Sequence, residues 1–173
     1  MLLKTIAQII GLIASAINIT AIQVKDKKSL YLALSVLVKL LYAINIAMLA
    51  EYAGMVTQLL SVVITIIAFI YAKKSKDIPK WMTGIFIGVT VLCGIITCKR
   101  VVGIMAIMCG ITYAVIVSSK NMKNIRRLTL IQSILWTTYD FLIGAYTASI
   151  SSAFVFVSTI IAILRYDIKK VAN

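Results

Sequence analysis

The chain contains no histidine, and acidic residues are few: five Asp and Glu stand against eighteen Lys and Arg in 173 residues. Without histidine a serine–histidine pair is excluded, and a zinc site would lack its most common nitrogen ligand. Asp140 is the one acid inside an apolar segment, so no pair of carboxylates is available there for general acid–base catalysis. We therefore expect no enzyme and no cofactor; Ser35 with Lys39 as its base is the one catalytic arrangement left to consider.

Cysteine and proline are also scarce. Cys93, Cys98 and Cys109 follow no spacing typical of metal or redox sites, which favours small, buried apolar thiols. The single proline, Pro79, lies between two apolar segments. Any hinge within a helix would therefore have to use glycine; the candidates are Gly11, Gly54, Gly103, Gly110 and Gly144.

Apolar residues, in contrast, make up 62% of the chain, and its mean hydropathy is +1.05. Segments of about 18 or more mostly apolar residues, long enough to cross a bilayer, recur along the whole sequence. They cover residues 3–24, 29–50, 55–72, 81–98, 101–119, 128–147 and 149–166. The first is assigned to a span and not to a signal peptide, because a leader would carry only Lys4. The sequence predicts an all-α polytopic membrane protein with seven transmembrane helices.

Basic residues gather on one side of the predicted membrane. With seven spans, the connections after the first, third and fifth lie on the same side as the C-terminus. That side holds fourteen basic residues: Lys25, Lys27, Lys28, Lys73, Lys74, Lys76, Lys80, Lys120, Lys123, Arg126, Arg127, Arg165, Lys169 and Lys170. The opposite side holds Lys4, Lys99 and Arg100. This excess predicts an N-terminus outside and a cytoplasmic C-terminus. The partners of the basic clusters are then membrane lipids and not nucleic acid.

The two ends of the chain share a pattern of polar and aromatic residues. An offset of 97 residues matches Ser35 with Gln132, Lys39 with Trp136, Tyr42 with Tyr139, and Ser61 with Ser158. An offset of 95 matches Gln8, Gly11, Ser15 and Asn18 with Gly103, Ala106, Gly110 and Tyr113. We predict two three-helix repeats, residues 1–72 and 101–173, joined by a linking helix within residues 73–100. Because a single helix links them, the repeats have the same orientation in the membrane.

Three stretches resemble the YgjV family of small bacterial inner-membrane proteins: AQIIGLIASAINIT at residues 7–20, KDKKSLYLALS at 25–35 and YTASISSAFVFVSTIIAILRY at 146–166. The three-one-three plan resembles the SWEET sugar transporters. The resemblance implies a SWEET-like fold in the bacterial inner membrane. Members of the family tend to carry asparagine in the third and last helices, and SWEET transporters use such asparagines on the substrate. At that level this chain has Ser61 and Ser158, with Gln58 one turn from Ser61.

Lys39, in the stretch LVKLLYAIN, needs a compensating partner or water, because inserting a lysine at mid-bilayer costs roughly 2.5–3.5 kcal/mol of free energy. The repeat matches Asp140 to Ala43, one helical turn beyond Lys39. We therefore predict that Lys39 and Asp140 pair at a central cavity, directly or through water or a ligand. The other predicted lining residues lie on the polar faces of the helices. The candidate ligand-binding residues are Lys39, Asp140, Tyr42, Tyr139, Trp136, Asn18, Asn45, Gln58, Ser61, Ser158, Gln132 and Ser35.

Two functions fit this pattern. The first is a small transporter or facilitator for a polar small molecule, which binds near mid-membrane between two triple-helix bundles that work by alternating access. The second is a non-transporting receptor or regulatory protein with the same fold. Hydrogen bonding between helices is the competing explanation for each polar residue, and a static ion pair for Lys39 and Asp140. Gly84 and Gly88 predict close packing of the linking helix on the first repeat, or alternatively a homo-oligomer contact.

Overall fold

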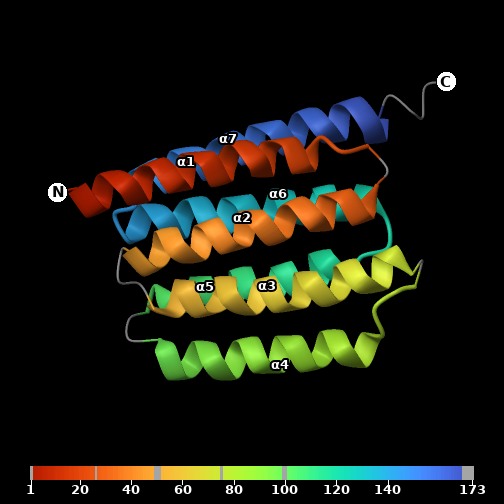
Figure 1. Cartoon of the computed structure of the whole chain (residues 1–173), viewed down its shortest axis with the longest axis horizontal. Coiled ribbons are helices and arrows are strands. Elements are labelled where there is room, and N and C mark those ends of the chain that lie inside the picture. Colours follow the sequence, from red (N-terminus) through yellow and green to blue (C-terminus); the bar gives the residue numbers. More distant parts are fainter. Residues whose placement is uncertain (1, 26, 49–51, 75, 99–100, 169–173) are drawn as a thin grey trace.

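The structure is a computed structural model that describes residues 2–25, 27–48, 52–74, 76–98 and 101–168. Within these ranges the chain forms seven α-helices and no strand (Figure 1). The helices are α1 (Leu2–Ile22), α2 (Lys28–Met48), α3 (Tyr52–Lys73), α4 (Lys80–Thr97), α5 (Gly103–Ser118), α6 (Met122–Leu142) and α7 (Tyr146–Ile163). A short π-helix, η1 (Leu164–Ile168), continues α7. The predicted all-α chain of seven helices is confirmed.

Five helices, namely α1, α2, α3, α4 and α7 with η1, are long and apolar enough to cross a membrane. The remaining two fall short for different reasons. α5 is apolar but has only 16 residues. α6 has 21 residues but carries Lys123, Arg126 and Arg127 in its first two turns, which lowers its mean hydropathy. The prediction of membrane-spanning helices is therefore confirmed for five segments.

α6 and α7 do not begin where hydropathy predicted them. The predicted sixth segment, 128–147, starts six residues after α6 begins and runs five residues past its end. Residues 143–145 form the turn between the two helices, where Gly144 has a φ of 76°, a conformation that glycine adopts without a Cβ clash. The prediction was wrong here because the basic first turns of α6 are helical without being apolar.

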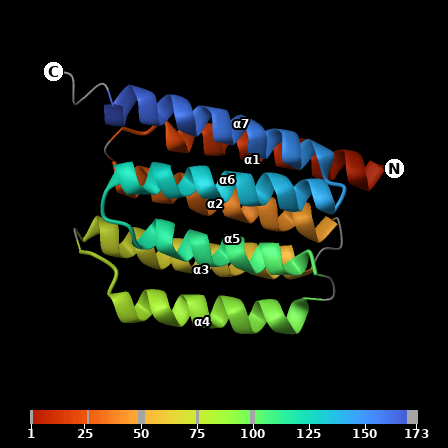
Figure 2. The same cartoon turned by 180° about the vertical axis from the view of Figure 1, so that it is seen from behind.

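The helices form two layers of three, with α4 at one edge. α1, α2 and α3 lie side by side in one layer, and α7, α6 and α5 lie behind them in that order (Figure 1, Figure 2). α1 packs on α7, and α3 packs on α5, which closes the two sides of the bundle. No comparable packing joins α2 and α6 among the described residues. These two helices therefore face each other across the middle of the molecule.

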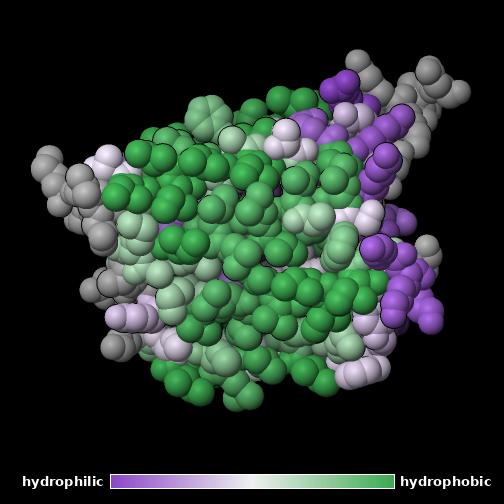
Figure 3. Space-filling view, viewed as in Figure 1, coloured by the Kyte–Doolittle hydropathy of each residue, from purple (hydrophilic) through white to green (hydrophobic). Residues whose placement is uncertain are grey.

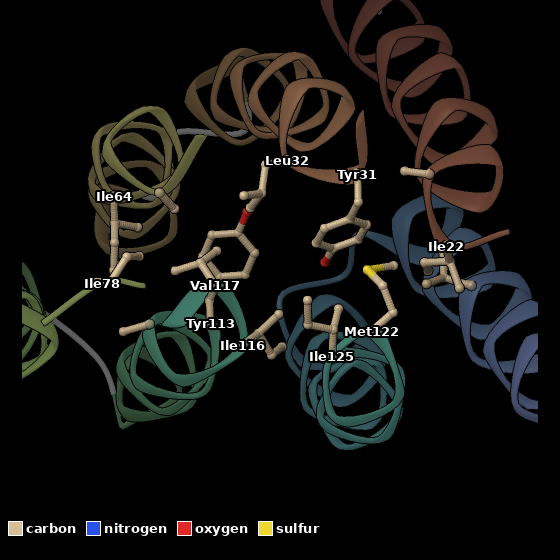
Figure 4. Packing of buried hydrophobic residues seen from close by; sticks show 14 of the residues in the cluster. Ile22, Tyr31, Leu32, Ile64, Ile78, Tyr113, Ile116, Val117, Met122 and Ile125 are labelled. Atoms are coloured by element: carbon tan, nitrogen blue, oxygen red, sulfur yellow. The ribbon is translucent and has the colours of Figure 1, made fainter. Parts of the chain in front are cut away.

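A cluster of buried apolar side chains fills one end of the space between the layers (Figure 4). Its members come from the last turn of α1, the first turns of α2 and α6, the middle and later turns of α3, α5 and α7, and the connection between α3 and α4. The side chains labelled in Figure 4 are Ile22, Tyr31, Leu32, Ile64, Ile78, Tyr113, Ile116, Val117, Met122 and Ile125. Packing of this kind leaves little free space, so this end of the bundle is closed.

The same end carries the exposed basic side chains, and it is called the basic end below. Hydrophilic surface gathers there, while the flank of the bundle is apolar (Figure 3). The exposed basic residues are Lys25, Lys27, Lys73, Lys74, Lys76, Lys80, Lys120, Lys123, Arg127 and Arg165. Four residues used in the prediction of orientation, Lys99, Arg100, Lys169 and Lys170, lie outside the described residues. The orientation of the termini stays a prediction.

α4 touches the rest of the bundle through few residues. Thr90 and Gly94 are its buried residues. A Cβ added to Gly94 would lie 2.3 Å from the side chain of Ile107 in α5, so the glycine permits a close approach of the two helices. Gly84 and Gly88 are exposed, and nothing lies within 4 Å of a Cβ built on either. The prediction that these two glycines pack on the first repeat is wrong, because α4 turns a different face inward.

Candidate functional site

A cavity lies between the two layers, and the apolar cluster forms its floor toward the basic end. Tyr31, Tyr113 and Val155 belong to both the cluster and the cavity wall. All helices except α4 contribute lining residues. The free space of about 50 Å³ accommodates roughly three to five water molecules. Among the residues that the structure describes, Lys39 and Asp140 are the only charged ones in the lining.

Nine of the twelve predicted residues line this cavity. They are Lys39, Asp140, Tyr42, Trp136, Asn18, Asn45, Gln58, Gln132 and Ser35. Along α2 and α6 the lining residues recur every three or four positions, singly or as adjacent pairs, so each helix turns one face to the cavity. The sequence pattern therefore identified the inward faces of α2 and α6. That these residues bind a ligand stays a prediction.

The other three predicted residues lie outside the cavity wall. Ser61 donates a hydrogen bond of 2.8 Å to a carbonyl of its own helix. Ser158 receives a hydrogen bond of 2.9 Å from the side-chain amide of Gln23, which joins α7 to the residue that follows α1. The ring of Tyr139 packs edge-on against Trp136, with 5.4 Å between ring centroids. The two serines therefore form hydrogen bonds within the protein, and Tyr139 packs against a residue of the cavity wall.

Lys39 is 8% exposed and lies in the middle of α2. Its Nζ lies 4.1 Å from the centroid of the Tyr113 ring and 5.9 Å from that of Trp136. A cation over an aromatic face is attracted by the ring quadrupole, which replaces part of the lost hydration. The described residues offer Nζ neither a carboxylate nor another hydrogen-bond acceptor within bonding distance. Its N–H donors therefore remain available to a ligand or to water.

Asp140, near the end of α6, is 5% exposed. The hydroxyl of Ser152 in α7 donates a hydrogen bond of 3.1 Å to its Oδ2. Asp140 and Lys39 form no salt bridge, so the prediction of a direct ion pair is wrong. The reason is that the ammonium lies against aromatic rings of α5 and α6, while the carboxylate bonds to α7. A link through water or a ligand stays a prediction.

Further lining side chains are either held by neighbours or left without a partner. Tyr42 and Ser15 share a hydrogen bond of 2.8 Å between their hydroxyl groups. The amide of Asn45 donates to a backbone carbonyl of α1. Oε1 of Gln58 and the indole Nε1 of Trp136 are buried without a hydrogen-bond partner in the described part of the chain. Unpaired buried polar atoms are uncommon, and in a cavity they indicate a place for water or a ligand.

The profile of a bacterial inner membrane protein family, Imp-YgjV, matches residues 5–170. The chain belongs to this family. No curated protein and no solved structure matches it. The match extends from α1 to η1, so it includes every residue of the cavity wall. With five apolar helices of sufficient length, this YgjV-family chain is a multi-pass bacterial inner-membrane protein. The predicted resemblance to this family is confirmed, while the SWEET-like plan stays a prediction.

Sequence reasoning missed five polar residues of the cavity in this YgjV-family protein. They are Tyr31, Tyr113, Thr129, Ser133 and Ser152. For Tyr113 a signal existed, because the repeat matches it to Asn18, which was predicted to line the cavity. Thr129 and Tyr31 lie three and four positions before predicted lining residues, on the same helix faces. Extending each polar stripe by one turn would have found these two.

The basic end of the YgjV-family protein contains a buried ion pair that the sequence did not predict. Nη1 of Arg126 donates to Oδ1 of Asp167 over 2.7 Å, and the two side chains are 3% and 6% exposed. Nη2 donates to the carbonyls of Val24 and Lys25, over 3.0 and 2.6 Å. The guanidinium also lies 4.9 Å from the centroid of the Tyr166 ring. We call this arrangement the arginine clamp; it joins α6, the connection that follows α1, and η1.

Proposed function

We propose that this YgjV-family protein is a small transporter or facilitator, and that a polar small molecule binds in its central cavity. The observation that carries the proposal is the environment of Lys39, a buried charge in mid-helix that lines a cavity and for which the described residues offer no hydrogen-bond acceptor. Ionisable residues inside membrane helices are expensive to keep, and they characteristically mark substrate or ion pathways. Oε1 of Gln58 and Nε1 of Trp136, which have no hydrogen-bond partner among the described residues, add two polar atoms to the same wall.

The helix contacts support two halves of like orientation. In the two halves, α1 corresponds to α5, α2 to α6 and α3 to α7. If each helix is exchanged for its counterpart, the contact between α1 and α7 becomes the observed contact between α5 and α3. The same exchange converts the contacts within the first half into those within the second. Such a pattern is expected of parallel three-helix repeats related by an axis along the membrane normal, with α4 as the linking helix. In this proposal all seven helices cross the membrane, and the substrate binds on the axis between α2 and α6.

We assign the basic end to the cytoplasm, following the positive-inside rule. Two layers close that end: the apolar cluster under the cavity and the arginine clamp beyond it. At the other end the cavity wall reaches Asn45 and Asp140, which lie within one turn of the ends of α2 and α6. In the proposal the structure corresponds to a state closed toward the cytoplasm. Transport then requires the cluster and the clamp to separate while the outer ends of the helices approach each other.

Thiol accessibility tests alternating access without knowledge of the substrate. Ser35 is replaced by cysteine in a protein whose three native cysteines are changed to alanine, and a membrane-impermeant thiosulfonate is added to right-side-out and to inverted membrane vesicles. Ser35 lines the cavity, so we expect the cysteine to react from both sides. Ser61→Cys is the matched control, because Ser61 is also buried but lies outside the cavity wall. It should stay unreactive from either side.

Labelling of Ser35→Cys from one side only would contradict alternating access. That result would favour the alternative proposal, a receptor or regulatory protein that binds a ligand from one side of the membrane. The small free space of the cavity is the observation that keeps this alternative in view, since a few water molecules fill it without any movement of the helices. Uptake assays on proteoliposomes with the ligand described below would then separate binding from transport.

A further inference from the structure

The cavity holds one positive and one negative side chain that do not neutralise each other. Lys39 and Asp140 are 8% and 5% exposed, and both line the same cavity. The ammonium rests on an aromatic ring and the carboxylate on a serine hydroxyl, with no salt bridge between them. Two opposite charges at such burial would normally be paired, because each pays a desolvation penalty that mutual contact would offset. Their separation indicates that a bound ligand compensates both charges.

The chemistry of each group specifies what it would bind. Lys39 has only donors, and the indole N–H of Trp136 is a further donor without a partner in the described part of the chain. Together they suit a carboxylate, which accepts several hydrogen bonds. Asp140 has one described hydrogen bond, from Ser152 to Oδ2, so lone pairs remain for a cationic donor. The cavity wall is therefore complementary to a negative group at Lys39 and to a positive group at Asp140.

Charge balance narrows the ligand further. The described lining is neutral overall when both side chains are ionised, since no other charged residue of the described ranges contributes to it. A simple anion would pair with Lys39 but would bring a net negative charge into the apolar bundle and leave Asp140 uncompensated. A simple cation would do the reverse. A zwitterion satisfies both side chains and leaves the site neutral, which is the arrangement that a low-dielectric interior favours.

We propose that the ligand of this cavity is a small zwitterion whose carboxylate binds Lys39 and the N–H of Trp136 and whose ammonium binds Asp140. The inference rests on the proposed function, because it assigns a ligand to the same cavity. The free space of about 50 Å³ limits the ligand to the size of a small amino acid, unless the two layers move apart. The ring of Tyr113 keeps the ammonium of Lys39 directed toward this space.

The test uses the purified full chain in detergent and isothermal titration with three matched series. Glycine, β-alanine and 4-aminobutyrate place the ammonium one, two and three carbons from the carboxylate, so they sample the unknown separation of the subsites. Acetate, propionate and butyrate lack the ammonium, and acetamide, propionamide and butyramide carry no charge. We expect one zwitterion to bind at least about tenfold more tightly than the carboxylate and the amide of the same chain length, since each lost charge contact leaves a buried partner unpaired.

Two variants assign the subsites. Asp140→Asn should remove the advantage of the zwitterion over the matched carboxylate, because the partner of the ammonium is neutralised while that of the carboxylate remains. Lys39→Met should abolish binding of both, and Lys39→Arg should restore part of it. Ser61→Ala, at a buried serine outside the cavity, should leave the affinities unchanged. If Lys39→Met is not monodisperse on size exclusion, the proposal is tested by Asp140→Asn alone, through the change in preference for the zwitterion over the matched carboxylate.

The proposal is overturned if no zwitterion binds more tightly than its matched amide, or if the preference survives Asp140→Asn. These results are distinct from failure of the transport function. Zwitterion binding with labelling of Ser35→Cys from one side would keep the ligand and reject transport. Labelling from both sides with no preference for a zwitterion would keep transport and reject this ligand.

Discussion

Replacing Arg126 by methionine tests the arginine clamp. The Asp167 side chain is only 6% exposed, and the change leaves its carboxylate without the cation that pairs with it. The change also removes two hydrogen bonds to backbone carbonyls. Breaking a buried ion pair by removing one partner costs about 3–5 kcal/mol. For a chain of this length such a loss lowers the melting temperature by roughly 6–20 °C. The double variant Arg126→Met with Asp167→Asn should lose less than the single variant, because no charge is left unpaired.

The chain offers a matched control at the same end. Lys120 and Asp77 form an ion pair of 2.6 Å, close to the length of the clamp, but their side chains are 72% and 52% exposed. An exposed pair contributes about 0–1 kcal/mol, so Lys120→Gln should change the melting temperature by only a few degrees. The assay is a thermal melt of the detergent-solubilised protein, followed by size exclusion. Equal effects of Arg126→Met and Lys120→Gln would refute the reasoning that burial sets the strength of the clamp.

Glycine positions supply two further predictions. Gly94→Ala should destabilise the protein by about 1–3 kcal/mol, because its Cβ would lie 2.3 Å from the side chain of Ile107. Gly88→Ala, on an open helix face, should be neutral or slightly stabilising. Thermal melts of the two variants compare them directly. Gly54→Ala would bring a Cβ within 2.7 Å of the Tyr139 hydroxyl and should cost about 1–3 kcal/mol by displacing the ring. An unchanged melt of Gly54→Ala would mean that the ring moves without cost.

Hydropathy was sufficient to find the helices, because a segment that crosses a bilayer must be long and apolar, and such a segment can satisfy its backbone hydrogen bonds there by forming a helix. It failed at the start of α6, where Lys123, Arg126 and Arg127 interrupt the apolar pattern within a continuous helix. There the helix is decided by packing and backbone hydrogen bonds, and its charges are accommodated at the basic end. Arg126, predicted to lie in the connection between the fifth and sixth spans, lies within α6 and is one of the more buried of the described residues.

Most of the polar residues of the cavity wall could also be predicted, because residues three and four positions apart share a helix face. The sequence could not determine how Lys39 is compensated. One buried base and one buried acid favour a direct pair, but rotamers and neighbours decide whether the two atoms meet. Here the ring of Tyr113, from a helix on the opposite layer, takes the place predicted for Asp140. Ser158 left the predicted site for a similar reason, since Gln23 lies within hydrogen-bond distance of it.

The lengths of α4 and α5 also bear on the surrounding lipid. Their 18 and 16 residues correspond to about 27 and 24 Å, whereas a typical hydrocarbon core is about 30 Å thick. The two helices are neighbours at one edge of the bundle, so the mismatch is concentrated there. In the proposal, where α5 crosses the membrane as α4 does, acyl chains beside this edge must shorten or splay, while those beside the longer α1 and α2 need not. The protein is therefore expected to deform its bilayer asymmetrically and to favour thinner membranes.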